Sequence, residues 1–338
     1  KAVELAPEFR EARARLARVL ATSGRLEDSI PHLQKVVELD PRDADGRLRL
    51  ARALMEVRRT DDATKEVAAL LAQQPDNLDG ILLSGRIHAV NGNPEAAERE
   101  FSRVTDLSSA TRDQRARAHL NMALLRQAQG RIQESIEFYG QTLKISPDQP
   151  QALFNLAVIL ASNQRLKGAA ELYQRLLQLD PSRTDVRYRL AVTEMGRGEL
   201  KAASEHFEQL VADRPLAIEL VTSSSLLLAE LGRGDEAADR LLAAISKTRD
   251  KAPKARLKST LGAVEIKNGY LERGLGHLRD AVDLAPDVPE VRKRYAEALA
   301  GEKRYAQAVD EYVAYGALAP GDDQATFAHA TCLIILDR

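Results

Sequence analysis

Proline recurs along this 338-residue chain at a fixed step of 34 residues, with two interruptions. The prolines in this register are Pro7, Pro41, Pro75, Pro147, Pro181, Pro215, Pro286 and Pro320. Each closes a similar short phrase, such as the Val-Glu-Leu-Asp that precedes Pro41. A fixed period near 34 residues is typical of arrays of two-helix units that pack mainly on their neighbours. The spacing therefore predicts an all-α solenoid, and it overrides the two domains that length alone would suggest.

The two interruptions are short insertions. The gap from Pro75 to Pro147 holds four residues more than two full steps, and the gap that ends at Pro286 holds three more. We expect these residues to lengthen loops at 110–115 and 246–254, where a longer connection costs little. Nine full repeats then account for residues 10–322 without remainder, over 10–43, 44–77, 78–115, 116–149, 150–183, 184–217, 218–254, 255–288 and 289–322.

Within each repeat, the residue three after the proline is taken as position 1. Positions 8 and 20 hold only Ala, Gly or Ser in all nine repeats, and small residues allow two helices to cross closely. Position 15 is glycine in six repeats, as expected where a left-handed residue ends the first helix. Proline at position 32 ends the second helix. Position 24 is usually bulky, as in Phe101 and Tyr139.

This combination resembles the tetratricopeptide repeat (TPR) family over essentially the whole chain. The resemblance implies one α-α superhelix over 1–338, with nine full helix–turn–helix repeats and a half repeat at each end. Residues 1–9 correspond to the tail of a preceding repeat, and 323–338 to the first helix of a further one. The family often has tryptophan at position 4, whereas this chain has none, so we expect position 4 to be only partly buried in several repeats.

The sequence offers no catalytic or metal-binding motif. His32, His206 and His277 share position 23 but belong to repeats one, six and eight, too far apart to converge on a metal ion. The single cysteine, Cys332, excludes an intrachain disulfide. A net charge of −1 gives no bulk attraction to nucleic acid, and no apolar run reaches the roughly 18–20 residues that span a bilayer. We therefore predict a non-enzymatic chain without cofactor, metal, nucleic-acid partner or membrane insertion in this segment.

In TPR proteins the first helices line a concave groove, and the resemblance implies that positions 2, 5, 6, 9, 12 and 13 face it. The candidate ligand-binding residues are Arg15, Arg18, Arg49, Arg52, Arg86, Leu120, Asn121, Leu124, Phe154, Asn155, Val158, Tyr188 and Val192. The arginines would bind carboxylates, because a guanidinium can donate to both oxygens. The apolar residues would hold a hydrophobic anchor. The predicted partner is a protein or extended peptide, acidic with a hydrophobic anchor.

An alternative interpretation of the arginines is intrahelical pairing. Glu11 precedes Arg15 by four residues, Asp45 precedes Arg49 by four, and Glu56 follows Arg52 by four. Such pairs contribute only about 0.2–0.5 kcal/mol each and could simply solvate the face. Arg18 and Arg86 have no such partner, so they are the better ligand candidates.

A protein-binding scaffold is the first functional prediction. The resemblance leaves two alternatives open: a structural arm of a bacterial envelope or polysaccharide-secretion machine, and the substrate-binding arm of a larger enzyme such as a peptide glycosyltransferase. We expect a fragment of a longer bacterial protein, with its compartment, cytoplasmic or periplasmic, undetermined. The terminal helix carries Phe327, Leu333, Ile334 and Leu336, an apolar strip that predicts self-association if nothing covers it.

Overall fold

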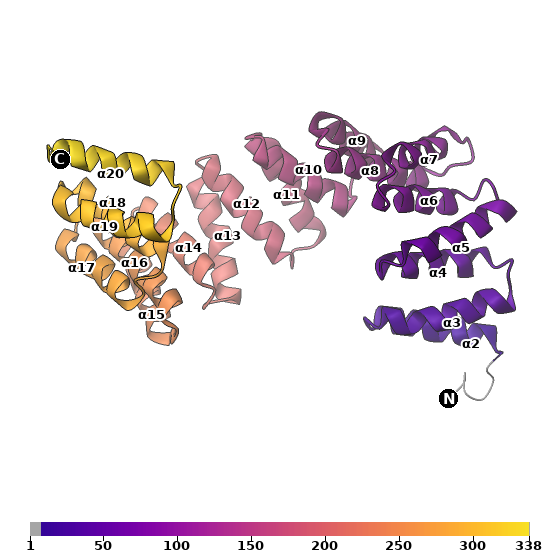
Figure 1. Ribbon diagram of the computed structural model, residues 1–338, viewed down its shortest axis with the longest axis horizontal. Coiled ribbons are helices and arrows are strands. Elements are labelled where there is room, and N and C mark those ends of the chain that lie inside the picture. The colour runs from indigo at the N-terminus through magenta and orange to yellow at the C-terminus, as the bar shows by residue number, and fades with distance from the viewer. Residues whose placement is uncertain (1–7, 338) are drawn as a thin grey trace. The chain divides into compact units, whose positions relative to one another are not determined.

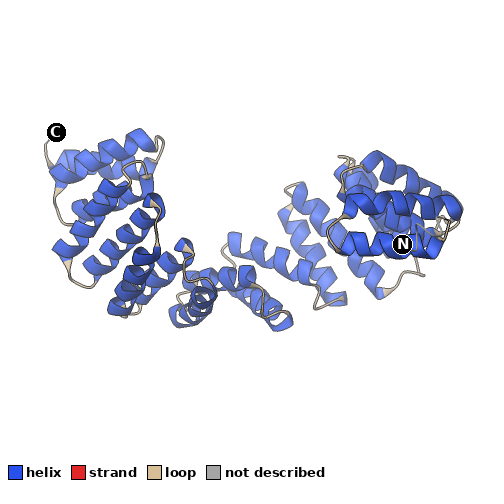
Figure 2. Cartoon of the chain, turned by 90° about the horizontal axis from the view of Figure 1, so that it is seen from below, coloured by secondary structure: helices blue, strands red, loops and turns tan. Residues whose placement is uncertain are grey.

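A computed structural model describes residues 8–337 of the chain. These residues form nineteen α-helices, and no strand occurs among them (Figure 2). The predicted all-α repeat fold is confirmed. The predicted tail of a preceding repeat, 1–9, lies almost wholly outside the described residues. Contacts divide the chain into two compact units, of which the first ends at Ile159 and the second begins at Leu160.

Unit 1 contains four complete helix pairs, labelled in Figure 1. Its first helices are α2 (Arg10–Thr22), α4 (Ala44–Glu56), α6 (Leu78–Val90) and α8 (Arg112–Ala128). Its second helices are α3 (Leu26–Leu39), α5 (Thr60–Gln73), α7 (Pro94–Asp106) and α9 (Ile132–Ile145). The next first helix, α10 (Pro150–Ser162), contains the boundary between the units.

Unit 2 continues the same alternation. Its first helices are α12 (Thr184–Gly196), α14 (Ile218–Glu230), α16 (Lys251–Lys267), α18 (Pro289–Gly301) and α20 (Asp323–Ile335). Its second helices are α11 (Leu166–Leu179), α13 (Leu200–Asp213), α15 (Gly234–Lys247), α17 (Leu271–Leu284) and α19 (Tyr305–Leu318). From α2 to α9 and from α11 to α20, each helix packs on the next one along the chain (Figure 1).

Local signals explain where the helices begin and end. The side chains of Asp43, Asn77 and Asp322 each accept a hydrogen bond from the backbone N–H three residues later, at 2.9–3.0 Å, and so cap α4, α6 and α20. All six glycines at position 15 have positive φ, from 71° to 89°. The repeats that lack this glycine adopt the same left-handed turn, with φ of 59–62° at Arg58, Gln164 and Lys303. The turn is therefore imposed by the packing of the helix pair.

The inserted residues do not lengthen loops as expected. Instead, α8 and α16 each contain 17 residues, whereas the other first helices contain 13. Both begin four residues before position 1, so each insertion adds one N-terminal helical turn. At α8 the reason is a capping box, in which Thr111 Oγ1 accepts from Gln114 N–H and the Gln114 side chain accepts from Thr111 N–H. An extra turn leaves the phase of the following repeat nearly unchanged.

The crossing of the two helices in each repeat is closely packed, as positions 8 and 20 predicted. Every Ala and Ser at these two positions is at most 1% exposed. The crossing of α16 with α17 has glycine on both sides. A Cβ added at Gly274 would lie 2.6 Å from the carbonyl oxygen of Gly262, and one added at Gly262 would lie 2.7 Å from that of Gly274. Nothing larger than glycine fits there unless the two backbones separate.

We expect Gly274→Ala to lower the free energy of unfolding of unit 2 by about 1–3 kcal/mol, because the new methyl group overpacks the crossing. Urea unfolding followed by circular dichroism measures this loss. Gly276→Ala is the matched control on the same helix, since a Cβ there meets nothing within 4 Å. The control should stabilise by about 0.5–1 kcal/mol through helix propensity. Equal midpoints for the two variants would contradict the packing argument.

Candidate binding site

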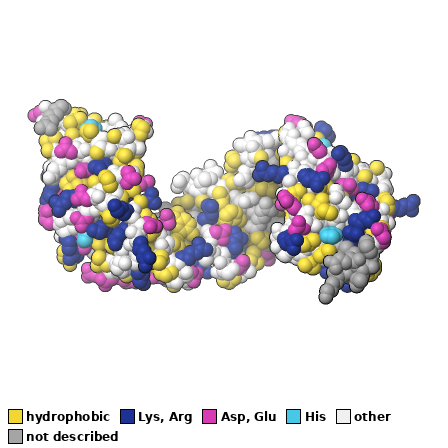
Figure 3. All heavy atoms as spheres, turned by 60° about the horizontal axis from the view of Figure 1, so that its bottom comes forward, with side chains coloured by type: hydrophobic (Ala, Val, Ile, Leu, Met, Phe, Trp, Pro, Cys, Tyr) yellow, Lys and Arg dark blue, Asp and Glu magenta, His cyan; other side chains and the backbone are white. Residues whose placement is uncertain are grey.

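First helices of neighbouring repeats touch one another within each unit. α4 contacts α6, α6 contacts α8, and in unit 2 α14 contacts α16 and α16 contacts α18. The side chains at positions 2, 5, 6 and 9 of these helices therefore form a shared surface, called here the first-helix face. On the side drawn in Figure 3, acidic and basic side chains are interspersed, without a large area of one sign. On this side of the molecule, any charge selectivity must therefore come from local clusters.

One such cluster surrounds a hollow of about 380 Å³ in unit 1. Its lining residues come from α2, α3 and α4: Ala14, Ala17, Arg18, Ala21, Leu26, Ser29, Leu33, Arg49, Arg52, Ala53 and Glu56. The floor is made of small and apolar side chains, whereas Arg18, Arg49 and Arg52 supply three guanidinium groups. The structure thus brings together three of the five predicted arginines. Arg15 and Arg86 do not line the hollow.

The ion pairs of these arginines differ in part from the predicted ones. Arg49 pairs with Asp45 at 2.5 Å, and Arg15 pairs with Glu11 at 3.9 Å, as the spacing predicted. Arg86 has no partner within its own helix, as the spacing predicted, but Glu56 of the preceding repeat lies 3.8 Å from it.

Neither Arg52 nor Arg18 forms an ion pair with a described residue of its own helix. Arg52 reaches across to Asp79 of α6, at 3.4 Å, instead of pairing with Glu56. Arg18 forms no ion pair with any residue from 8 to 337. Its exposed guanidinium is therefore the cation of the hollow that is most available to a ligand.

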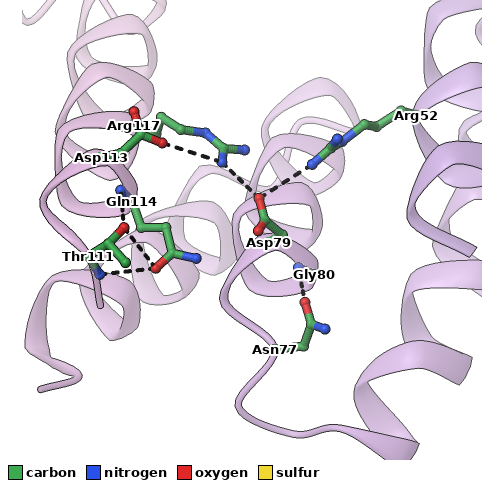
Figure 4. Close-up of polar contacts among 8 residues, drawn as sticks. All are labelled: Arg52, Asn77, Asp79, Gly80, Thr111, Asp113, Gln114 and Arg117. Carbon is green, nitrogen blue, oxygen red and sulfur yellow. Dashed lines mark hydrogen bonds and ion pairs between the residues drawn. The ribbon is translucent and has the colours of Figure 1, made fainter. Parts of the chain in front are cut away.

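Asp79 joins three successive first helices (Figure 4). Its Oδ1 accepts from Arg117 Nη1 of α8 at 2.7 Å and from Arg52 Nη2 of α4 at 3.4 Å. Asp113 lies 4.0 Å from Arg117 on the other side. A carboxylate that accepts from two guanidinium groups fixes both of them. This contact holds Arg52 at the rim of the hollow and links the repeats along the first-helix face.

The predicted apolar middle of the groove is only partly accessible in α8 and α10. Leu120 is only 6% exposed, and Asn121, Leu124, Phe154 and Val158 are half-buried. Leu120 therefore contributes to packing between repeats.

The remaining candidates, Asn155 on the one hand and Tyr188 and Val192 on the other, differ in how available they are to a ligand. Asn155 Nδ2 donates to Tyr139 Oη at 3.0 Å, so its amide is already engaged within the protein. Tyr188 and Val192 of α12 are 37% and 46% exposed and remain accessible in unit 2. Tyr188 stands edge-on to Phe207, with ring centroids 6.0 Å apart.

Buried charges at position 11 were not predicted. Glu194 is 3% exposed, and its Oε2 has no hydrogen-bond partner among the described residues, although His206 Nε2 lies 3.7 Å away. Burial raises the pKa of the Glu194 carboxyl and lowers the pKa of the His206 imidazole. Both shifts disfavour the charged forms. Position 11 is apolar Leu in five repeats, which is the sequence signal that this position is internal.

Other potential sites are limited. Among residues 8–337, no three His, Cys, Asp or Glu side chains are arranged to hold a metal ion. None of the described helices is long and apolar enough to cross a membrane.

Burial raises the pKa of the Cys332 thiol on α20. On α20, Phe327 and Ile334 are 75% and 73% exposed, whereas Leu333 and Leu336 pack against the core. Self-association through this helix stays a prediction.

The paired helices and the shared first-helix face define a helical-repeat solenoid. Two models of the tetratricopeptide repeat match the chain, one over residues 22–80 and 160–222 and the other over residues 120–184. These segments belong to the tetratricopeptide-repeat family, and the rest of the described chain repeats the same pair of helices. A search of curated proteins finds no match to this chain.

Several solved structures are similar to this one. A structure from a functional characterisation of Pseudomonas aeruginosa pilF has a TM-score of 0.51 at 19% identity and covers 65% of this chain and 97% of its own. PilW is described as a widely conserved type IV pilus biogenesis factor. Its structure has a TM-score of 0.52 at 19% identity, and the match covers 62% of this chain and 96% of the PilW chain. A thermophilic TPR protein of Thermus thermophilus has a TM-score of 0.44 at 26% identity, and the match covers 55% of this chain and 99% of the Thermus chain. At these identities the likeness to the two pilus proteins shows the fold alone.

We expect Glu194→Gln to stabilise the protein at neutral pH by about 1 kcal/mol, because it removes a buried charge. A carboxyl whose pKa is raised in the folded state stabilises fully below its unfolded pKa, and this stability is lost as pH rises through the folded pKa. The advantage of the glutamine variant should therefore be large at pH 7 and small near pH 4. Thermal unfolding across this range measures it. Exposed Glu199→Gln is the control and should change little, and a constant difference across pH would contradict the assignment.

Proposed function

We propose that this chain is a non-catalytic scaffold that binds an extended acidic peptide of another protein on its first-helix face. The observation that carries the proposal is the hollow between α2 and α4, where unpaired Arg18 lies beside Arg49 and Arg52 over an apolar floor. A ligand carboxylate can accept from these guanidinium groups. A neighbouring small or branched apolar side chain of the ligand fits the floor formed by Ala17, Ala53 and Leu33.

The charge balance of the hollow supports an acidic ligand. Three arginines line it together with a single carboxylate, that of Glu56, which also lies near Arg86. Asp45 and Asp79 partly neutralise Arg49 and Arg52 from outside the hollow. Arg18 is left with an uncompensated charge. An acidic residue of the ligand that approaches Arg18 therefore gains an ion pair without breaking one.

Two other roles stay open as proposals: a structural arm of a bacterial secretion machine and the substrate-binding arm of a larger enzyme. PilW is described as a type IV pilus biogenesis factor, but the likeness of PilW and pilF to this chain is a likeness of fold. No residue of this chain favours either role over a peptide-binding scaffold.

Fluorescence anisotropy with labelled eight-residue peptides tests the proposal. The probe alternates Glu with Ala or Leu, and its counterpart has Lys in place of Glu. We expect the acidic probe to bind, more weakly at higher salt, and the basic one not to bind. Arg18→Gln should weaken binding about tenfold, because it removes a charge-assisted hydrogen bond.

Arg25→Gln is the matched control for this substitution. Arg25 lies in the turn after α2, is exposed, and already pairs with Asp28 at 2.7 Å. The Arg25→Gln substitution changes the net charge by the same amount as Arg18→Gln, and Arg25 does not line the hollow. Binding by the Arg25 variant should stay within about twofold of the unmodified protein. Equal losses in the two variants would reduce the effect to general electrostatics and contradict the proposed site.

A further inference from the structure

Unit 2 has a second hollow on its own first-helix face, with a different chemistry. It measures about 450 Å³ and lies between α14, α16 and α18. Its lining residues are Ile218, Glu219, Thr222, Ser223, Leu226, Arg256, Ser259, Thr260, Glu290, Val291 and Arg294. They occupy positions 1, 2, 3, 5, 6 and 9 of three consecutive first helices. Hydroxyl groups and charges of both signs therefore meet in one place, whereas the unit 1 hollow is apolar with a basic rim.

Arg294 is the unusual residue of this hollow. Its Nη1 donates to Thr260 Oγ1 at 3.0 Å and approaches Ser259 Oγ at 3.4 Å. Both hydroxyl-bearing residues are 1% exposed, so they form a fixed support for the guanidinium. Glu290, four residues before Arg294, has the spacing of an intrahelical partner, but it lies 3.9 Å from Arg256 instead. No carboxylate of residues 8–337 forms an ion pair with Arg294.

The guanidinium of Arg294 is thus hydrogen-bonded to neutral groups, and Glu297 attracts it electrostatically without forming an ion pair. Burial lowers its pKa, which reports that the charge is partly removed from water. A guanidinium has five N–H donors, and within residues 8–337 only Nη1 of Arg294 donates to the protein. A partly desolvated charge without a partner is costly, and it is stabilised by an anion that supplies the missing acceptors. The remaining donors of Arg294 are therefore available to a ligand in the hollow.

We propose that the hollow between α14, α16 and α18 binds a carboxylate of a partner peptide at Arg294, next to a basic group of the same peptide. A carboxylate matches the fork of the guanidinium. Glu219 lines the same hollow and forms no ion pair with any described residue, and the Glu290–Arg256 pair is long, at 3.9 Å. Two acidic neighbours disfavour a dianion such as phosphate and favour a ligand that also carries a positive charge. The peptide segment that this hollow recognises therefore carries an acidic residue next to a basic one.

This inference goes beyond the proposed function, because it assigns a second site with a different ligand preference in the other unit. It does not depend on binding at the hollow of unit 1. Loss of one site by substitution should leave the other unchanged, so the two proposals can fail separately.

NMR titration of the full chain tests the assignment, with sodium acetate, inorganic phosphate and the blocked dipeptide acetyl-Glu-Lys-amide as probes at constant ionic strength. The side-chain Nε–Hε resonance of Arg294, assigned by its disappearance in Arg294→Gln, should move saturably with acetate. The dipeptide should bind more tightly than acetate, and phosphate more weakly. In Arg294→Gln the shifts of nearby amides in α16 and α18 should need about tenfold more acetate.

Arg279→Gln, an exposed arginine of α17 outside the hollow, is the control and should leave acetate binding within about twofold. If Arg294→Gln does not fold, Glu219→Gln provides the second variant. It should tighten acetate binding about threefold, because it removes a like charge from the hollow. Equal acetate binding in all variants, non-saturable shifts, or tighter binding of phosphate than of acetate would each overturn the proposal.

Discussion

The fold of this protein depends on how closely the two helices of each repeat can cross. Positions 8 and 20 meet at that crossing, and their Ala and Ser side chains are completely buried. Their small size lets the helix axes approach, and the bulky residues one turn away, such as Phe101, Tyr139 and Phe207, then fill the space beside the crossing. Where both positions are glycine, at Gly262 and Gly274, each backbone lies where a methyl group would be.

The crossing also determines the turn that joins the helices. Position 15 is left-handed in all nine repeats, including the three where Arg58, Gln164 and Lys303 replace glycine. A non-glycine residue in this conformation costs about 1–2 kcal/mol, so the helix pair must supply more than that. For this reason the period alone predicted the start of every first helix except α8 and α16. At these two helices, counting from proline assigned the insertion to a loop, although the capping signal at Thr111 and Gln114 indicated a helix start.

The binding face was less predictable than the fold. Spacing along one helix identified the pairs Glu11–Arg15 and Asp45–Arg49, because these residues compete with few alternatives. It failed for Arg52, since Asp79 of the next repeat offers a better-placed carboxylate. The same competition leaves Arg294 without an acidic partner. Such exchanges between repeats are set by the packing of first helices against each other, and that packing has no signature in the spacing of charges within one repeat.

Hydrogen–deuterium exchange of the full chain, with and without the acidic probe peptide, shows whether a ligand lies along the first helices. The account predicts slower amide exchange in α2 and α4 when the peptide is present, with α5 and α7 unchanged, because only the former pair carries the arginines of the hollow. Protection confined to α5 and α7 would place the ligand on the second helices. That result would contradict the account.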